Sequence, residues 1–327
     1  MKPFTYSRAT NIADAATFAE QPGGKFLGGG TNLIDLMKMG VEQPDHLLDV
    51  TRLPYAEIED LPGGGLRIGA TVRNSTLAEH PAVVKRYPIL AEALLSGASP
   101  QLRNAATVGG NLMQRTRCYY FTDPIFPRCN KRAPGTGCGA IDGCNRIHAI
   151  LGQSAHCIAV HPSDMCVALA ALEAVIRVRG AKGEREIPMG DFHRLPGDTP
   201  HLDTNLAAGE LITAVDLPPP KPSARGHYLK VRDRASYSFA LVSVAAMLTM
   251  QGGAIETARI ALGGVAHKPW RAREAEEKLS GADPSEKVFR LAADAALLGA
   301  KGHGDNDFKI ELARRAMVRA LTVAAAS

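Results

Sequence analysis

Cysteine is missing from most of this 327-residue chain. None stands before Cys118 or after Cys166, and five of the six cysteines lie between Cys118 and Cys157. Such a distribution excludes a scaffold that is held together by disulfides along its whole length. Cysteines crowded into one stretch favour a metal site over disulfides if the protein works in a reducing compartment.

Long apolar runs are missing as well. The longest, at 239–250, is too short to span a bilayer and is interrupted by Ser243 and Thr249. The N-terminal residues MKPFTYSRATNIADAATF show neither an apolar h-region nor a small-residue cleavage site, so a secretory signal is not expected. We therefore expect no membrane or export address in this chain, which would be cytoplasmic, or periplasmic if a partner carries it across the membrane folded.

A strong charge imbalance is also lacking. The formal net charge is +5, and the Lys and Arg residues are scattered along the chain. Without a basic stripe or a known module, nucleic-acid binding is not expected. A hydrophobic content of 45% and a charged content of 22% are ordinary for a globular protein. The length allows two or three domains, each with its own core.

Helical and strand patterns alternate along the chain, which indicates an α/β or α+β architecture. Before residue 181 we predict helices at 11–20, 33–40, two pieces within 75–95 and 163–174, and strands at 25–30, 46–50, 63–72 and 174–180. The segment 101–113 is predicted as strand, loop and strand. A proline-rich linker at 217–225 is followed by predicted strands within 227–250 and at 258–265, and by predicted helices at 273–281, 285–299 and 309–323. The main domain boundary is expected near Pro220.

Residues 25–36, KFLGGGTNLIDL, place three glycines between a predicted strand and a predicted helix. Glycine permits close backbone approach, and the amides and dipole of the following helix suit a phosphate. Thr31 and Asn32 are suitable N-cap residues, and Asp35 lies in the first turn. The stretch has neither a Rossmann G-x-G-x-x-G nor the Lys-Ser/Thr of a P-loop, so a capped glycine turn is the structural alternative.

Two further loops carry polar groups that could contact a ligand. In 101–114, Gly109, Gly110 and Asn111 offer donors to a flat polar ligand, and a β-bulge or tight hairpin is the alternative. In 161–174, Asp164 lies in the first turn of a helix, where an acid either binds a sugar hydroxyl or stabilises the helix dipole. None of the three loops identifies a function alone.

Taken in order, the loops resemble those of the FAD-binding subunit of the molybdenum hydroxylases, the family of xanthine dehydrogenase, carbon monoxide dehydrogenase and aldehyde oxidoreductase. Four stretches before the linker carry this resemblance: FLGGGTNLIDLMK, RIGATVRNSTLAEHP, LRNAATVGGNLMQ and HPSDMCVALAALEA. After the linker, YLKVRDRASYSFALVSVAA and ARIALGGVAHKPWRAREAEEKL look like the C-terminal domain of that subunit. The resemblance covers nearly the whole chain.

The resemblance implies an α+β fold with a vanillyl-alcohol-oxidase (PCMH)-type FAD-binding domain of two α/β subdomains at 1–220. A CO-dehydrogenase-flavoprotein-like α+β domain would follow at 221–327. Thr107, Gly110 and Asn111 would lie along the flavin and ribityl chain, Asp164 would bind ribityl or ribose hydroxyls, and Lys230 would reach the flavin from the second domain. The loop that would surround the FAD pyrophosphate comprises Lys25, Phe26, Leu27, Gly28, Gly29, Gly30, Thr31, Asn32, Leu33 and Ile34.

An insertion at 112–159 separates the GGN loop from the PSD helix. It looks like the insertion of a family subset that includes 4-hydroxybenzoyl-CoA reductase and the periplasmic aldehyde oxidoreductases, where it carries an additional [4Fe-4S] cluster. Four thiolates are needed to hold such a cluster. The segment is rich in glycine, proline and arginine and shows little periodicity, so it cannot form an apolar core of its own. A cluster would fix it as a structural metal fixes a small domain.

Six cysteines compete for four ligand positions. We predict Cys118, Cys129, Cys138 and Cys157, because Cys118 and Cys157 stand where the insertion leaves and rejoins the scaffold. Cys144 could replace Cys157. No C-x-x-C occurs, which disfavours zinc-ribbon and ferredoxin sites.

The remaining cysteine and two histidines receive structural interpretations. Cys166 is predicted to be a small core residue within a helix. His148 and His156 are close enough in sequence to be ligands, but loop histidines of this kind are expected to be solvated. Disulfides within the insertion are the alternative if the protein works in the periplasm.

The resemblance implies an electron-transfer subunit that holds FAD and a [4Fe-4S] cluster within a heterotrimer. A molybdopterin-binding large subunit would oxidise the substrate, and a small subunit with two [2Fe-2S] clusters would pass electrons to FAD and then to an external acceptor. RTRCYYF, CNKRAPGTGCGA and LGGVAHKPWR look closest to the periplasmic aldehyde oxidoreductases. Aromatic aldehydes and an acceptor other than NAD are therefore expected, and no catalytic base is expected in this chain. The alternatives are a flavin-free metal-binding scaffold and a self-sufficient FAD oxidase.

Overall fold

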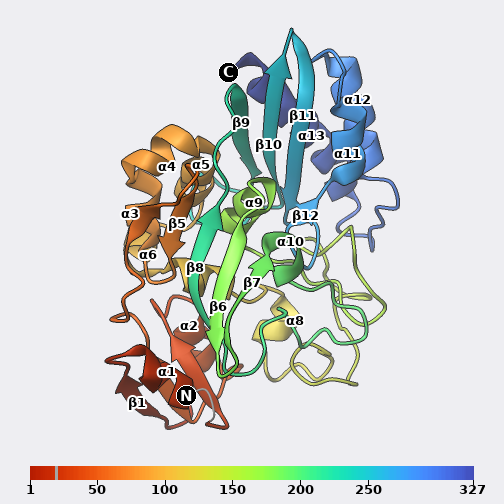
Figure 1. The fold of residues 1–327 in the computed structure, drawn as a ribbon. Coiled ribbons are helices and arrows are strands. Elements are labelled where there is room, and N and C mark those ends of the chain that lie inside the picture. The colour runs from red at the N-terminus through yellow and green to blue at the C-terminus, as the bar shows by residue number, and fades with distance from the viewer. Residues whose placement is uncertain (19–20) are drawn as a thin grey trace.

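Three β-sheets with helices packed around them make up the computed structural model, which describes residues 1–18 and 21–327. Figure 1 shows the N-terminal sheet at the bottom, a larger sheet in the middle and the C-terminal sheet at the top. The expected α+β class is confirmed. The helix predicted at 11–20 is observed as α1 (Ile12–Phe18), and its last two predicted residues lie outside the described residues.

The N-terminal sheet is parallel, with the strand order β1 (Thr5–Arg8), β3 (His46–Asp49), β2 (Gly24–Leu27). Parallel neighbours need crossover connections, which α1 and α2 (Leu33–Lys38) help to supply. The carboxyl end of β2 therefore runs directly into the glycine loop, and the sheet fixes where that loop starts.

The central sheet is antiparallel and joins segments that are far apart in sequence. Leu66 of β5 pairs with Leu217 of β8, so the end of the first 220 residues folds back onto their beginning. The short helix α10 (Met189–Phe192) follows β7 (Gly183–Pro188) directly. The strand order is β4 (Ile58–Asp60), β5 (Leu66–Gly69), β8 (Leu211–Leu217), β6 (Val175–Gly180), β7 (Gly183–Pro188).

Three short helices, rather than the two predicted pieces, cover residues 74–96. Proline occupies the first position of two of them, where its missing N–H is harmless and its fixed φ starts a helix. Each proline thus begins a new helix and ends the preceding one. The helices are α3 (Asn74–Glu79), α4 (Pro81–Arg86) and α5 (Pro88–Ser96).

The strand, loop and strand predicted at 101–113 are wrong. This segment forms α6 (Pro100–Ala105) and α7 (Val108–Leu112). Ser99 caps α6 by accepting the amide of Leu102 at 3.3 Å, and Thr107 caps α7 by accepting the amide of Gly110 at 3.2 Å. These side-chain caps stabilise helices despite the glycine pair in α7.

The C-terminal sheet is antiparallel and is covered on one face by α11 (Arg273–Leu279), α12 (Glu286–Ala296) and α13 (Phe308–Ala326). Its other face contacts α5 and α9 (Asp164–Ala171) of the N-terminal part. Residues 232–241 form a loop, which interrupts the strand pattern predicted over 227–250. The strand order is β12 (Trp270–Arg271), β11 (Ala254–Gly263), β10 (Val242–Gln251), β9 (Ala224–Val231).

The cysteine-bearing insertion has little regular structure, and α8 (Tyr119–Thr122) is its one helix. It lies at the lower right of Figure 1, below the C-terminal domain. The C-terminal domain holds it in place, because Asn306 Nδ2 donates hydrogen bonds to the carbonyls of His148 and Ala149, and Lys309 Nζ donates to that of His148. The insertion thus depends on residues near the end of the chain for its shape.

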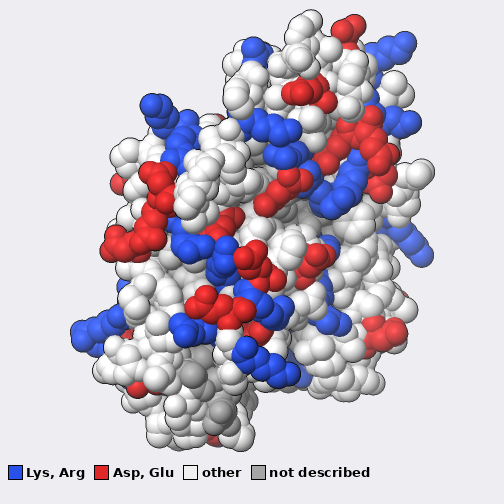
Figure 2. Space-filling view, in the orientation of Figure 1, with Lys and Arg blue, Asp and Glu red and all other residues white. Residues whose placement is uncertain are grey.

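Charges of both signs are intermixed across the middle of the face in Figure 2, with no single-sign patch on that face. Within the described ranges, no helix combines the length and the apolar character needed to cross a bilayer.

Candidate functional site

A cavity of about 600 Å³ is lined by residues of the N-terminal sheet, the central sheet and α7. The glycine loop that follows β2 forms part of its wall, and Thr107, Gly109 and Gly110 of the capped α7 segment form another part. The volume is in the range of sites for small molecules and cofactors. The cavity therefore lies where two of the three predicted loops meet.

The glycines of the loop are required by close packing against the start of α7. A Cβ atom added at Gly29 would lie 1.9 Å from the carbonyl oxygen of Ala105, and one added at Gly28 would lie 2.6 Å from Thr107 Oγ1. Gly30 has a φ of +73°, which residues with a Cβ rarely adopt. These glycines therefore let the loop pack against residues 105–107 while it lines the cavity, a position that suits a phosphate-binding loop.

Two buried polar atoms on the cavity wall have no hydrogen-bond partner among the described residues. They are Asn32 Nδ2 and Thr71 Oγ1. Buried polar groups are nearly always paired, so such atoms at a cavity wall suit a polar ligand. Asn32 does not cap α2 as expected from the sequence, because its Oδ1 accepts the backbone N–H of Arg115 at 2.8 Å instead.

Most of the predicted FAD-binding residues line this cavity. These are Lys25, Phe26, Leu27, Gly28, Gly29, Gly30, Thr31, Asn32, Leu33, Thr107 and Gly110. Ile34 and Asn111 do not line it, and Asn111 Oδ1 accepts hydrogen bonds from Ser163 Oγ and Gln114 Nε2, both at 2.6 Å.

Asp164 and Lys230 also lie outside the cavity lining, but they are bound to each other. Lys230 Nζ is 2.7 Å from Asp164 Oδ2, and Tyr228 donates its hydroxyl to the other carboxylate oxygen at 2.7 Å. The two charged side chains are only 4% and 8% exposed. The structure therefore brings these two residues together away from the cavity lining, and the pair connects α9 to β9 across the domain interface.

The opposite wall of the cavity was missed by the sequence interpretation. It is formed by residues 201–212, with Phe18, Val50 and Tyr55 contributing apolar surface nearby. Residues 201–212 contain no glycine loop that marks a ligand site and become part of the wall only when β8 inserts into the central sheet.

A second, much smaller cavity lies inside the insertion and is lined by Cys118, Cys129, Cys138 and Cys157. These are the four cysteines predicted as ligands. Cys129 and Cys138 face each other in an isolated antiparallel bridge, and Cys118 and Cys157 are buried. Cys144 is exposed and does not line this cavity, and Cys166 is fully buried in α9, in the apolar core.

One nitrogen lies close to each of two of these sulfurs. His148 Nε2 is 3.1 Å from Cys118 Sγ, and the backbone N–H of Ala159 lies 3.4 Å from Cys157 Sγ. Burial raises the pKa of the Cys118 thiol to about 12 and that of Cys157 to about 11. His148 is 1% exposed, so the expectation of a solvated histidine is wrong, because the side chain is enclosed beside Cys118. The His156 side chain is half exposed.

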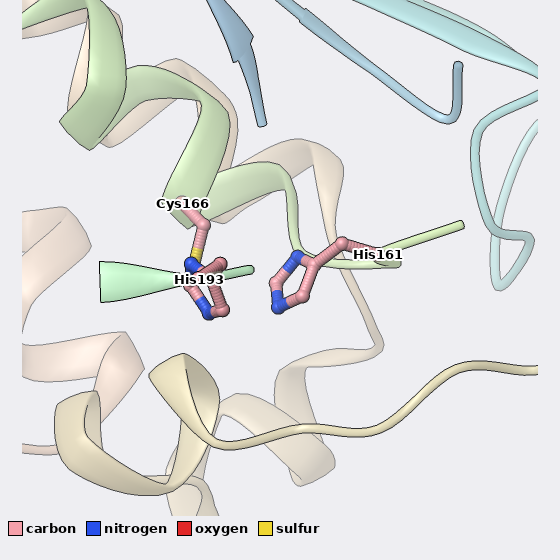
Figure 3. Close-up of side chains that lie close together, drawn as sticks. All are labelled: His161, Cys166 and His193. Carbon is pink, nitrogen blue, oxygen red and sulfur yellow. The ribbon is translucent and has the colours of Figure 1, made fainter. Parts of the chain in front are cut away.

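Figure 3 shows another group of ligand-type side chains: His161, Cys166 and His193. Their ligand atoms lie within 4.8 Å of one another, the one such set of three or more among the described residues. His161 Nδ1 accepts the amide of Ser163 at 3.3 Å, and His193 Nε2 is 2.8 Å from the carbonyl oxygen of Leu112. A structural zinc site needs four ligands, and this buried set supplies three. The hydrogen bonds of His161 and His193 are those of polar side chains packed in the protein core.

The sequence matches two family models end to end. Residues 2–220 match the FAD binding domain in molybdopterin dehydrogenase, and residues 227–324 match the CO dehydrogenase flavoprotein C-terminal domain. Together these matches span almost the whole chain.

Relatives of known name match this chain over most or all of its length. The chain is 51% identical to the aldehyde oxidoreductase FAD-binding subunit PaoB of Escherichia coli (strain K12), over 100% of this chain and 99% of the relative. It is 30% identical to the glyceraldehyde dehydrogenase medium chain of Sulfolobus acidocaldarius, over 85% and 81%. A carbon monoxide dehydrogenase structure from Hydrogenophaga pseudoflava superposes with a TM-score of 0.78 at 26% identity, covering 100% of this chain and 99% of that chain. The cavity, its glycine loop and these matches establish that the chain is an oxidoreductase subunit of the molybdenum hydroxylase family, the FAD-binding subunit.

Proposed function

We propose that the protein is the FAD- and [4Fe-4S]-containing electron-transfer subunit of a molybdenum-dependent aldehyde oxidoreductase. The 51% identity to an aldehyde oxidoreductase FAD-binding subunit over the full length supports the aldehyde assignment. In this proposal the partners are a molybdopterin-binding large subunit and a small subunit with [2Fe-2S] clusters, arranged as a heterotrimer. The complex would be periplasmic by co-export, or cytoplasmic, and the domains would meet near Pro220.

The proposed FAD site uses the bare backbone of the glycine loop for the pyrophosphate. Gly28 to Asn32 present amides at the cavity wall, and the following α2 adds its N-terminal dipole. Asn32 Nδ2 and Thr71 Oγ1 supply the free polar atoms, and Thr107 and Gly110 approach from α7. When bound, FAD supplies the chemistry of accepting electrons and passing them on, and the chain's residues bind and orient it.

Asp164 and Lys230 are proposed to contact the cofactor after their mutual ion pair rearranges. Both side chains are almost fully buried at the junction of the two domains. Ser163, which precedes Asp164 at the start of α9, donates a hydrogen bond to Asn111. A lysine held at this junction can offset negative charge, and the carboxylate can accept hydrogen bonds from hydroxyls. Asn111 and Ile34 are proposed to support the loop rather than to line the cavity.

The single observation that carries the cluster proposal is the convergence of Cys118, Cys129, Cys138 and Cys157 on one cavity. Among the described residues, no three of these sulfurs all lie within 4.8 Å of one another. Their spacing is therefore wider than the binding of a single metal ion needs. A four-iron cluster held by four thiolates is a larger group than one ion. His148 and the amide of Ala159 would donate hydrogen bonds to the cluster's sulfur ligands, a contact that tunes such clusters.

The proposal is tested by expressing the chain with its partner subunits and measuring visible absorbance, flavin content and iron content of the purified complex. We expect stoichiometric FAD and one four-iron cluster in this chain beyond the iron of the small subunit. Material with zinc and no flavin would instead support a metal-binding scaffold. Aldehyde oxidation by the isolated chain would support a self-sufficient oxidase.

Serine variants of individual cysteines test the ligand set. Cys138→Ser is expected to lower iron by about one cluster per chain, because four thiolates are required. Cys144→Ser and Cys166→Ser are the matched controls, since neither sulfur lines the cavity, and both should retain full iron. Full iron content in Cys138→Ser, or loss of the cluster in Cys144→Ser, would contradict the assignment.

A further inference from the structure

The larger cavity, where FAD is proposed to bind, is called the flavin cavity, and the smaller one lined by four cysteines is called the cysteine cavity. A row of charged side chains starts at the glycine loop of the flavin cavity. Lys25 forms an ion pair with Glu42 Oε2, and the other oxygen of Glu42 accepts a hydrogen bond from Arg115 at 2.5 Å. All three side chains line the flavin cavity. Arg115 is also fixed through its backbone, which donates to Asn32, and its guanidinium lies 4.7 Å from the ring centre of Phe121.

The row continues from Arg115 into the insertion. Arg115 Nε donates to Asp203 Oδ2 at 2.8 Å, and the second oxygen of Asp203 forms an ion pair with Lys131. Lys131 Nζ also donates to the carbonyl oxygen of Pro200 at 2.8 Å. Asp203 lines the flavin cavity, whereas Lys131 lines the cysteine cavity and not the flavin cavity. An unbroken ion-pair row therefore joins the two cavities.

The row is enclosed at its insertion end, where water screens its charges little, whereas Lys25 at the other end is 44% exposed. The side chain of Lys131 is 1% exposed, and those of Arg115 and Asp203 are 21% and 26% exposed. Although burial alone would raise the pKa of Asp203, Lys131 and Arg115 hold it well below its usual range. The aspartate is thus ionised, and His267 Nε2 stands 3.7 Å from it as a further neighbour.

The charges of the row do not cancel. Lys25, Arg115 and Lys131 are cations, and Glu42 and Asp203 are anions, which leaves an excess of one positive charge. Both proposed occupants, a pyrophosphate and a cluster bound by four thiolates, are negative. The Asp203 carboxylate at the flavin cavity is neutralised by Arg115 and Lys131. Removing Lys131 would leave it with Arg115 as its remaining ion-pair partner in the row. The positive potential at the flavin cavity would then fall.

We propose that this row is an electrostatic link through which the charge of Lys131, at the cysteine cavity, raises the affinity for FAD, so that Lys131 is a positioning residue that acts through Asp203 and Arg115. The inference rests on the proposed function, because it takes FAD as the occupant of the larger cavity. It assigns to Lys131, a residue of the insertion, a role at a site that it does not touch. It also gives the insertion a purpose besides holding iron.

The experiment titrates FAD into the full chain after flavin removal and measures the dissociation constant by flavin fluorescence. Lys131→Met is expected to weaken FAD binding at least about 5-fold, the lower range of measured coupling between sites. Lys131→Gln keeps a hydrogen-bond donor near Pro200 and Asp203 without the charge, and should weaken binding similarly. Lys278→Met, an exposed lysine on α11, loses the same net charge and should bind FAD as the wild type does.

A double-mutant cycle that combines Lys131→Met with Lys25→Met tests whether the two ends of the row act together on FAD affinity. Coupled ends give non-additive changes in the dissociation constant, whereas independent effects add. Wild-type affinity in both Lys131 variants, or strictly additive effects, overturns the inference. So does a loss of affinity that follows iron content across preparations rather than the substitution. If the wild-type chain itself fails to bind FAD, the proposed function fails instead, and the two results are therefore distinguishable.

Discussion

Gly29 shows how a single missing side chain builds the cofactor cavity. Its Cα faces the carbonyl of Ala105, and the space there is smaller than a methyl group. Thr107, two residues after Ala105, both caps α7 and contacts Gly28. The glycine loop and the α7 cap therefore have to pack together before either wall of the cavity is in position.

Gly29→Ala is expected to abolish measurable FAD binding in a fluorescence titration, because the added methyl group would displace the loop from Ala105. Overpacking of this kind costs about 1–3 kcal/mol, which should also lower the thermal midpoint by several degrees. Gly190→Ala is the matched control, because nothing lies within 4 Å of an added Cβ there. Retention of normal FAD affinity in Gly29→Ala would show that the loop does not bind the cofactor.

At the scale of elements, the insertion is a long loop clamped by other parts of the fold. Asn306 is fully buried, donates to the carbonyls of His148 and Ala149, and accepts the amide of His303 at 2.6 Å. These bonds take the place of the regular hydrogen-bond ladder that the insertion lacks. They hold the backbone on which His148 contacts Cys118.

Asn306→Ala is expected to speed amide hydrogen exchange in residues 145–153 and to destabilise the protein by about 1–3 kcal/mol, because the carbonyl of Ala149 loses its donor and that of His148 keeps only Lys309. Asn205→Ala serves as the control, since Asn205 Nδ2 bonds the carbonyl of Asp191 outside the insertion. Hydrogen exchange by mass spectrometry locates the change. Unchanged protection of 145–153 in Asn306→Ala would mean that the insertion holds its shape without the clamp.

The elements also show what local sequence could and could not predict. The helices α11 to α13 follow from their amphipathic spacing, and β2 with α2 follows from the glycines between them. The segment at 101–113 was misinterpreted because Ala-Ala-Thr-Val resembles a strand, whereas Ser99 before Pro100 and Thr107 before Val108 were the cap signals that decide it. His148 was expected in solvent because the side chains that pack against it, Cys118 and the two tyrosines after it, come from a distant part of the insertion.

At the scale of the whole molecule, the two domains share a core. Tyr228, Ala245 and Ala261 of the C-terminal sheet are buried in the same cluster as α5 and α9. The alternation of apolar residues predicts which face of a strand is buried, but it does not predict which element covers that face. The packing of the C-terminal sheet against α5 and α9 therefore could not be predicted from the sequence. The wall at 201–212 was missed for the same reason, since it becomes a wall only through the pairing of β8 with β5 and β6.

The buried pair of Asp164 and Lys230 tests this interface. Lys230→Met should destabilise the full chain by about 3–5 kcal/mol in chemical denaturation, because it leaves a buried carboxylate without its cation. Arg290→Met is the control, since its exposed pair with Glu286 within α12 contributes only about 0.3–0.5 kcal/mol. A loss in Lys230→Met no larger than that of the control would show that the interface does not depend on this pair.

The clamp on the insertion has a consequence for how the chain is made. Asn306 and Lys309 are synthesised 158 and 161 residues after His148, yet they fix the backbone on which His148 contacts Cys118. The thiols are translated long before those partners exist. A nascent chain therefore carries its cysteines in an open loop until residues 306–309 have been made, and iron delivered before then would meet ligands that are not yet held in place.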